Sequence, residues 1–239
     1  MKLVASDPAH SELCQAITLL PGSVRALLAS EWTRAAQFEH ASIASFGRFA
    51  LELLAFGAPP ELVAGAHRAA LDEVRHAQLC FTLASLYAGT TLGPGPLALD
   101  ARAFDTFDLE RSVRSAVIEG CVGETLAAVE ASHVRDLTGH VYVRDVLSTL
   151  ASDESEHAAL AFRFVSWAVH HVGAPLRAAV RAAFGDARSR VRAREAPAGR
   201  ECDALLAEHG RLTAGARHAV RARALTELIE PLAAELCQG

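Results

Sequence analysis

Two copies of one five-residue pattern contain the residues best suited to chemistry. The first is Asp-Glu-Val-Arg-His at positions 72–76 and the second is Asp-Glu-Ser-Glu-His at positions 153–157. Residues three apart on an α-helix lie on one face, so the Glu and the His of each copy point the same way. A carboxylate beside an imidazole is half of a metal site, and two facing halves can hold two transition-metal ions. The two pairs are Glu73 with His76 and Glu154 with His157.

A third Glu-x-x-His spacing, from Glu130 to His133, indicates how little the spacing means by itself. Roughly one such pair is expected by chance in a chain with this content of Glu and His. Glu130 also lacks the preceding Asp that both other copies share. The doubled pattern with its Asp, and not the spacing alone, therefore indicates a site.

The elements that must position these pairs are helices. Ala, Leu, Val and Arg dominate the sequence, aromatic residues make up 6%, and Gly and Pro gather in a few clusters, which is typical of an all-α protein. Breaks at 57–60, 89–106 and 138–140 divide the first part of the chain. The predicted helices are 24–56, capped by Ser23, then 60–88, then 109–137, capped by Asp108, and a fourth that ends near Val172.

Short turns join the first helix to the second and the third to the fourth, whereas the middle connection is long. This order predicts two antiparallel hairpins joined by a crossover, which is a four-helix bundle. We expect an N-terminal segment at 1–22, the bundle at 23–172, and a helical extension at 173–239 that packs on the bundle or makes a subunit contact. Breaks in the extension are expected at Gly185, 196–199 and Gly210, before a last helix that Thr213 caps and Pro231 interrupts.

Antiparallel geometry predicts which residues of the other two helices complete the site. Residues equally far from a tight turn lie at the same height on the two helices of a hairpin. Reflecting the first pair across Gly57 leads to about position 40, where Glu39 lies on an otherwise apolar face. Reflecting the second pair across Gly139 leads to about position 122, where Glu124 is the nearest carboxylate and Glu119 is the alternative. A carboxylate on an apolar face is unfavourable unless it is paired or bound to metal.

The predicted site therefore combines four carboxylates and two imidazoles, Glu39, Glu73, His76, Glu124, Glu154 and His157. Four ionised carboxylates balance two divalent cations, and without metal they would repel one another in a dry core. Oxygen and nitrogen ligands without thiolate favour iron or manganese over zinc, although copper would bind as well. Asp72 and Asp153 are predicted to accept the second ring N–H of a ligand imidazole.

The doubled pattern and its two partner carboxylates resemble those of the ferritin-like di-metal carboxylate proteins. This superfamily includes rubrerythrins, ribonucleotide reductase small subunits, acyl-carrier desaturases and soluble di-iron monooxygenases. The resemblance covers about residues 24–172 and is nearest to the oxygenase and desaturase branch, where Asp-Glu-x-Arg-His recurs. It implies a ferritin-like bundle with two iron ions, or an Mn/Fe or Mn/Mn pair, and dioxygen as co-substrate. It also implies that the six residues are both metal ligands and catalytic residues.

Three departures narrow what this resemblance implies. Glu156 stands where the second copy should have an arginine like Arg75, so its hydrogen bonds must differ. Reductase subunits with a tyrosyl radical have a Tyr four residues after the first His, where this chain has Cys80. Tyr87 is too far along the helix to replace it, so a tyrosyl-radical function is not expected. Ala128 stands where some oxygenases have a Thr one turn beyond the third-helix Glu.

Small residues precede Glu124 at Gly120, Cys121 and Gly123. They would either leave space for a substrate or dioxygen pocket, or let this helix pack closely against its neighbours. Close packing is the more frequent reason for small residues on a helix.

Charge and cysteine usage exclude several other classes of function. The net charge of −5 argues against wholesale binding to nucleic acid. The sequence has no apolar run long enough to span a membrane, and its first residues lack the apolar core of a signal peptide. The widely spaced cysteines fit a reduced cytoplasmic protein rather than a disulfide framework. They are Cys14, Cys80, Cys121, Cys202 and Cys237.

These features together predict a cytoplasmic oxidoreductase. Two metal ions, expected to be iron, would use dioxygen to hydroxylate or otherwise oxidise a small organic substrate. The sequence shows no flavin, NAD or iron–sulfur motif, so an external electron donor would be needed, and the extension could join two copies in a homodimer. One alternative is a ferroxidase, peroxidase or manganese-catalase-like protein without an organic substrate. Another is a structural bundle that keeps the motif without the chemistry. A tRNA-hydroxylating role would need a basic face on the protein, and the sequence indicates none.

Overall fold

The computed structural model describes residues 8–99, 106–193 and 203–238, and helices are the only regular secondary structure within them. This confirms the all-helical prediction. Residues 100–105 of the long connection, the predicted break at 196–199 and Cys202 lie outside the described residues. No helix among the described residues is long and apolar enough to cross a membrane. The helices are α1 (Pro8–Leu19), α2 (Gly22–Ala55), α3 (Pro60–Ala88), α4 (Leu109–Ser115), the π-helix η2 (Ala116–Glu124), α5 (Thr125–Leu137), α6 (Val141–Val172), α7 (Ala174–Arg192), α8 (Asp203–Glu208), α9 (Ala214–Ala224), the π-helix η3 (Leu225–Ile229) and α10 (Glu230–Gln238).

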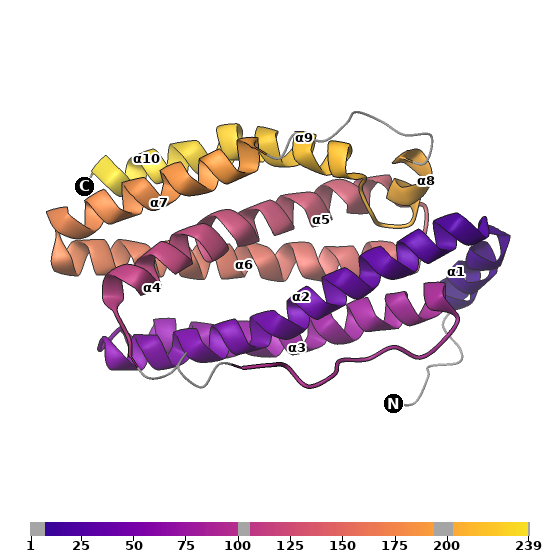
Figure 1. Ribbon diagram of the computed structural model, residues 1–239, viewed down its shortest axis with the longest axis horizontal. Helices are drawn as coiled ribbons and strands as arrows, with labels where there is room; N and C mark the ends of the chain where they lie inside the picture. The colour runs from indigo at the N-terminus through magenta and orange to yellow at the C-terminus, as the bar shows by residue number, and fades with distance from the viewer. Residues whose placement is uncertain (1–7, 100–105, 194–202, 239) are drawn as a thin grey trace.

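Two long hairpins form the centre of the molecule (Figure 1). In the first, α2 packs along α3, and in the second, η2 and α5 pack along α6, while α3 also contacts α6. Gly57 lies in the turn between α2 and α3 with a φ of +67°, a conformation that glycine adopts without strain. Helices α7, α9 and α10 form a third layer against the second hairpin.

The helix between the crossover and the second turn contains a π-helical segment. Asp108 caps its start as predicted, because its carboxylate accepts a hydrogen bond from the backbone N–H of Arg111 at 2.7 Å. Residues Ala116–Glu124 then adopt the wider π-helix before α5 continues the rod. The predicted single helix is therefore continuous but not uniformly α-helical, and Glu124 is the last residue of the π-segment. Such segments are frequent at functional sites.

Two smaller predictions about helix ends are wrong. Ser23 does not cap α2, because the helix already begins at Gly22, directly after Pro21, and makes no side-chain cap. Gly185 does not break the chain, because it lies inside α7. Thr213 does cap α9 by accepting from the backbone N–H of Ala216, and the π-helix η3 precedes Pro231, which lacks the N–H of a regular turn.

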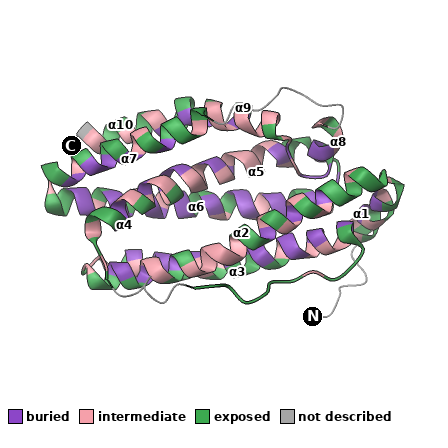
Figure 2. Ribbon diagram, in the orientation of Figure 1, coloured by how far each residue is buried: buried purple, intermediate pink, exposed green. Residues whose placement is uncertain are grey.

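The buried apolar side chains form two large clusters at opposite ends of the hairpins. On α2 the first cluster ends at Ala36 and the second begins at Phe46. On α6 the first ends at Leu150 and the second begins at Leu160. Figure 2 shows that buried residues concentrate on α3 and α6. The stretch between the two clusters is where the doubled pattern lies, so polar side chains occupy the middle of the core.

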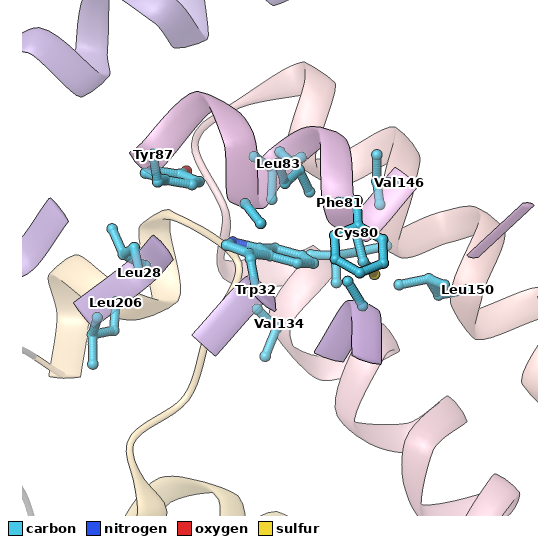
Figure 3. Close-up of a cluster of buried hydrophobic side chains, with 14 of the residues drawn as sticks. Leu28, Trp32, Cys80, Phe81, Leu83, Tyr87, Val134, Val146, Leu150 and Leu206 are labelled. Carbon is cyan, nitrogen blue, oxygen red and sulfur yellow. The ribbon is translucent and has the colours of Figure 1, made fainter. Parts of the chain in front are cut away.

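The C-terminal region closes one end of the first cluster, which surrounds Trp32 (Figure 3). The indole N–H of Trp32 donates to the backbone carbonyl of His209 at 3.3 Å. The ring of His209 meets the hydroxyl of Tyr87 at 3.0 Å and lies 4.5 Å from the ring of His140. Gly210, with a φ of +81°, fits against Trp32 and Val143 where a Cβ would be 2.5 Å from Val143 Cγ1. We call the loop His209–Arg211 the plug.

Candidate metal centre

Two overlapping groups of ligand-type side chains lie between the apolar clusters. The first contains Glu39, Glu73, His76 and Glu154, and the second contains Glu73, Glu124, Glu154 and His157. Within each group, one ligand atom from every residue lies within 4.8 Å of the others. The structure thus brings together all six residues of the predicted site. Glu73 and Glu154 belong to both groups, so the two groups share these two carboxylates.

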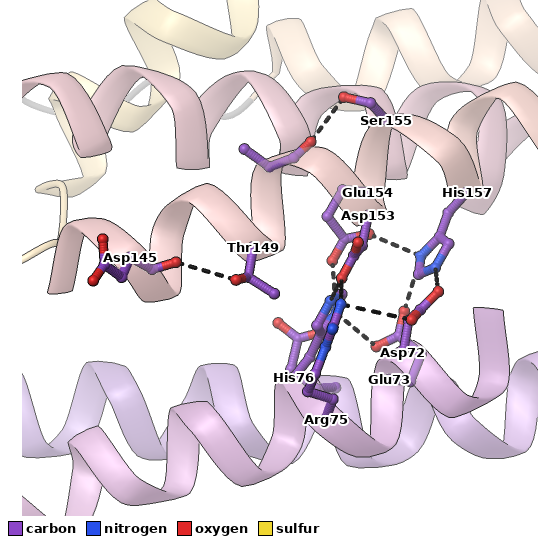
Figure 4. Close-up of polar contacts among 12 residues, drawn as sticks. Asp72, Glu73, Arg75, His76, Asp145, Thr149, Asp153, Glu154, Ser155 and His157 are labelled. Carbon is purple, nitrogen blue, oxygen red and sulfur yellow. Dashed lines mark hydrogen bonds and ion pairs between the residues drawn. The ribbon is translucent and has the colours of Figure 1, made fainter. Parts of the chain in front are cut away.

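Four helical segments supply these side chains. Glu39 comes from α2, Glu73 and His76 from α3, Glu124 from η2, and Glu154 and His157 from α6. Figure 4 shows the α3 and α6 members pointing toward one another across the space between these helices. Glu73, His76, Glu154 and His157 are at most 4% exposed. Such burial of ionisable groups is unfavourable unless they are paired or hold ions.

The Nδ1 atom of each imidazole faces the carboxylates. In the first group, His76 Nδ1 lies 3.5 Å from Glu154 and 3.7 Å from Glu73. Glu39 is 3.8 Å away from the same atom. In the second, His157 Nδ1 lies 3.3 Å from Glu73 and 3.2 Å from Glu154. Ligands about 2 Å from a common ion are separated from one another by distances of this size.

The Nε2 atom of each imidazole faces an aspartate of the other helix. His76 Nε2 lies 2.9 Å from Asp153 on α6, and His157 Nε2 lies 3.5 Å from Asp72 on α3. The sequence predicted aspartate partners for the imidazoles but not this exchange between helices. His76 Nε2 thus has a hydrogen-bond partner, whereas His157 Nε2 lies only at ion-pair distance from Asp72. Both rings turn Nδ1 toward the carboxylates, which is the orientation that a metal ligand would need.

Arg75 joins the two aspartates. Its guanidinium donates to the carboxylate of Asp153 and lies 3.7 Å from that of Asp72. The Arg75 side chain is 52% exposed, so this ion pair lies at the solvent side of the cluster. Position 156, which corresponds to it in the second copy, holds an exposed glutamate. Sequence reasoning noticed this asymmetry, but not that one arginine reaches both aspartates.

The pKa values of the four carboxyls of the cluster are shifted in two directions. Burial, reinforced by the charge of Glu154, raises the pKa of Glu39 and of Glu124 well above its usual value. Burial alone would also raise the pKa of Glu73 and of Glu154, but the nearby imidazoles of His157 and His76 outweigh it and lower both pKa values. The two unshared carboxyls therefore favour the neutral form and the two shared ones stay ionised.

The imidazoles carry the balancing positive charge. Burial would lower the pKa of His76 and of His157, but the nearby carboxylates of Glu154 and Glu73 raise these pKa values to about 11 and about 9. Two imidazolium ions thus face two shared carboxylates. The protons on these imidazoles lie where metal cations would be bound. Binding of divalent cations would displace them.

Several buried atoms of the cluster have no hydrogen-bond partner among the described residues. They are Glu73 Oε2, His76 Nδ1 and His157 Nε2. A buried polar atom without a partner costs about 1–3 kcal/mol. Glu73 Oε2 and His76 Nδ1 are 3.7 Å apart, so a cation between them would satisfy both. The donor set of carboxylates and imidazoles, together with these two atoms, fits a pair of divalent transition-metal ions.

The surroundings of the cluster are close-packed. Phe46 packs on the ring of His157 with 5.0 Å between ring centroids. A Cβ added at Gly120 would be 2.4 Å from Ala161 Cβ, so this small residue lets η2 pack closely on α6. Of the two uses predicted for the small residues before Glu124, packing is the one seen at Gly120.

Glu119 and Glu130 lie outside the two groups. Glu119, the alternative ligand, has its pKa raised by burial and by the nearby charge of Glu52, and it lines an open cavity of about 300 Å³ with Asp108 and Arg111. Glu130 instead forms ion pairs with Arg217 and Arg221 of α9. The carboxylate of the third Glu-x-x-His spacing therefore ties the C-terminal region to α5.

A comparison of the chain with models of known families, with curated proteins and with solved structures finds no match. The resemblance to ferritin-like proteins therefore rests on the residues and their geometry.

Proposed function

We propose that this chain is an oxidoreductase with a carboxylate-bridged pair of metal ions, expected to be iron, that activates dioxygen to oxidise a small organic substrate. The two groups that share Glu73 and Glu154 carry this proposal. These two shared carboxylates would help to hold both ions of the pair that two-metal chemistry uses.

We also propose that residues 23–172 form a ferritin-like four-helix bundle and that residues 173–239 form an extension packed on it. The short turns at Gly57 and Gly139, and the long connection between α3 and α4, support this topology. In this scheme the two hairpins face each other so that each contributes one carboxylate–imidazole pair and one further carboxylate.

The residues of the proposed centre would have different roles. Glu39 and His76 would hold one ion and Glu124 and His157 the other, while Glu73 and Glu154 would bridge them. Asp153 and Asp72 would keep the ring protons on Nε2, and the apolar clusters on either side would keep bulk water away. When bound, the two ions supply the binding and reduction of dioxygen.

The proposal also covers the electron donor, the alternative metal ions and the location of the protein in the cell. An external electron donor would reduce the centre, and Mn/Fe or Mn/Mn would be the alternative ion pairs. We place the protein in the cytoplasm, where the four cysteines of the described residues, all free thiols, would stay reduced. The negative net charge disfavours nucleic acid as a partner.

Anaerobic loading with ferrous iron, followed by exposure to oxygen, tests this function. We expect about two iron ions per chain and an absorption change on oxygen addition that requires both. The variant His157→Ala should retain its helical content but lose this response. Wild-type protein that binds no metal, or that binds metal but consumes no oxygen, would contradict the proposal.

One observation favours a second function. Because Ala161 occupies the space beside Gly120, the structure assigns a packing role to this small residue near Glu124. Small reactants such as ferrous ion or hydrogen peroxide would need no large cavity, so a ferroxidase, peroxidase or manganese-catalase-like activity is the alternative. Multiple turnovers of hydrogen peroxide without added organic substrate would favour it over the oxygenase.

A further inference from the structure

A continuous chain of polar contacts joins the two imidazoles on their outer side. Asp153 Oδ2 receives both His76 Nε2, at 2.9 Å, and the guanidinium of Arg75. On the other side of Arg75, its guanidinium lies 3.7 Å from the carboxylate of Asp72. That carboxylate in turn lies 3.5 Å from His157 Nε2. Arg75 is the middle member of this chain (Figure 4).

We propose that Arg75 is a positioning residue that serves both halves of the metal centre through Asp153 and Asp72. The inference rests on the proposed function, because it concerns the orientation of the two ligand imidazoles. It goes beyond that function in assigning to one exposed arginine of the first copy an effect on the metal site of the second.

The sequence asymmetry supports this assignment. In the first copy the residue before the His is Arg75, whereas in the second it is Glu156, which is exposed and has no guanidinium to pair with an aspartate. Among the described residues, Arg75 is the only arginine or lysine that forms an ion pair with either aspartate. The two copies of the pattern therefore share one guanidinium group, that of Arg75.

The physical role of this cation is to fix two carboxylates that would otherwise turn toward water. Asp72 and Asp153 have side chains that are 35% and 19% exposed, so both can be solvated from outside the bundle. A ligand imidazole is held in orientation by the acceptor of its second ring proton, and loss of such an acceptor typically weakens metal binding about 10–100-fold. Guanidinium, with several N–H groups in a plane, can hold two carboxylates at once.

A plain surface ion pair is the competing explanation. Such pairs contribute little to stability, and Arg75 is half exposed. Under that explanation, replacing Arg75 would change neither metal affinity nor the imidazoles. The test must therefore measure the centre and not only the stability of the fold.

Cobalt(II) titration of the full-length metal-free protein provides the first readout, because its visible bands report the ligands of each ion. For Arg75→Gln we expect affinity at both sites to fall about 10-fold or more, with the urea midpoint nearly unchanged. Arg163→Gln is the matched control, because Arg163 is also exposed on a core helix and should leave both affinities unaltered. Weakening at only the His76 site, or at neither, would overturn the proposal.

Relocating the arginine provides the second readout. Positions 75 and 156 are equivalent in the two copies, so an arginine at 156 should reach across to Asp72 as Arg75 reaches Asp153. The double variant Arg75→Gln/Glu156→Arg should therefore recover much of the lost affinity at both sites. A double variant no better than Arg75→Gln would contradict a role that depends on the contact with the aspartates.

Ring nitrogen chemical shifts in metal-free protein give a readout that does not depend on metal binding. In wild type, Nε2 of His76 and of His157 faces a carboxylate that Arg75 holds. We expect both Nε2 signals to shift in Arg75→Gln and to return in the double variant. If wild type bound no cobalt, the proposed function would fail, while these shifts would still decide whether Arg75 positions both rings. Unchanged shifts would reject the inference.

Discussion

At the scale of single residues, the centre is defined by which carboxylates are shared. Glu73 and Glu154 belong to both ligand groups, whereas Glu39 and Glu124 belong to one each. The pKa values follow the same division, since burial raises the pKa of each unshared carboxyl and the nearby imidazoles lower the pKa of each shared one. Shared and unshared carboxylates should therefore respond differently to substitution.

Replacing a shared carboxylate should disturb both ions. We expect Glu73→Gln and Glu154→Gln each to reduce bound metal to less than about one ion per chain, because a neutral amide is a poor bridging ligand. Glu39→Gln and Glu124→Gln should each retain about one ion. Elemental analysis after metal loading and desalting measures the difference. Glu130→Gln is the control, because Glu130 pairs with α9 and should leave both ions bound. Equal losses from all four variants would contradict the division.

Metal uptake should release protons. With pKa values of about 11 and about 9, His76 and His157 are protonated at pH 7 in metal-free protein, and a metal ligand must be neutral imidazole. Binding at pH 7 should therefore release about two protons or more, and affinity should rise as the pH increases from 6 toward 9. Calorimetric titration in buffers of different ionisation enthalpy counts the protons. Uptake without proton release would be inconsistent with these imidazolium ions.

At the scale of elements, close contact between η2 and α6 holds Glu124 opposite the doubled pattern. This contact depends on Gly120, whose missing side chain makes room for Ala161. Contacts of the His209 side chain hold the plug in place. Its ring lies within hydrogen-bond distance of the Tyr87 hydroxyl and packs against the ring of His140. Loss of either contact should lower the stability of the protein.

A methyl group at Gly120 should destabilise the protein. Gly120→Ala places a Cβ within 2.4 Å of Ala161 Cβ, and we expect a loss of about 1–3 kcal/mol in the free energy of unfolding. Gly47→Ala is the matched control, since no atom lies within 4 Å of the added Cβ in α2 and alanine favours the helix. The double variant Gly120→Ala/Ala161→Gly should recover part of the loss. Urea unfolding measures all three, and equal stability of the two single variants would refute the packing role.

The plug should loosen in acid. Burial and the nearby His140 lower the pKa of His209 to about 4, from an ordinary value of 6.5, so the unfolded chain binds a proton that the folded chain excludes. Stability should therefore fall as the pH drops from about 6.5 to about 4, by an amount on the order of 2 kcal/mol from this group. His209→Asn should show a shallower decline in the urea midpoint over this range. Parallel declines in both proteins would rule out this role.

The sequence predicted the elements better than their contacts. Gly, Pro and capping signals indicated the four long helical stretches, because these signals act locally. Reflection across the turns led to Glu39 and Glu124, which the structure places beside the doubled pattern, while their role as ligands stays a prediction. The exchange of aspartates between helices and the reach of Arg75 depend on the separation of α3 and α6. Local signals contain no information on that separation.

At the scale of the whole molecule, a polar centre lies between two apolar clusters, and a third layer of helices braces one hairpin. Ion pairs of Glu31 and Glu130 with Arg217 attach α9 to α2 and to α5. The centre itself contains four carboxylates and two imidazoles, and proteins tolerate such burial when the groups are paired or hold ions. The proposed metal pair would account for this burial of ionisable groups.

Metal content, measured on protein purified without added metal and again after anaerobic loading with ferrous iron, tests this explanation most directly. We predict about two transition-metal ions per chain after loading, and a rise in the thermal unfolding midpoint that follows from binding to the folded state alone. The variant Glu73→Gln should show neither. Wild-type protein that retains no metal after loading, and that unfolds at the same temperature with and without iron, would contradict the account.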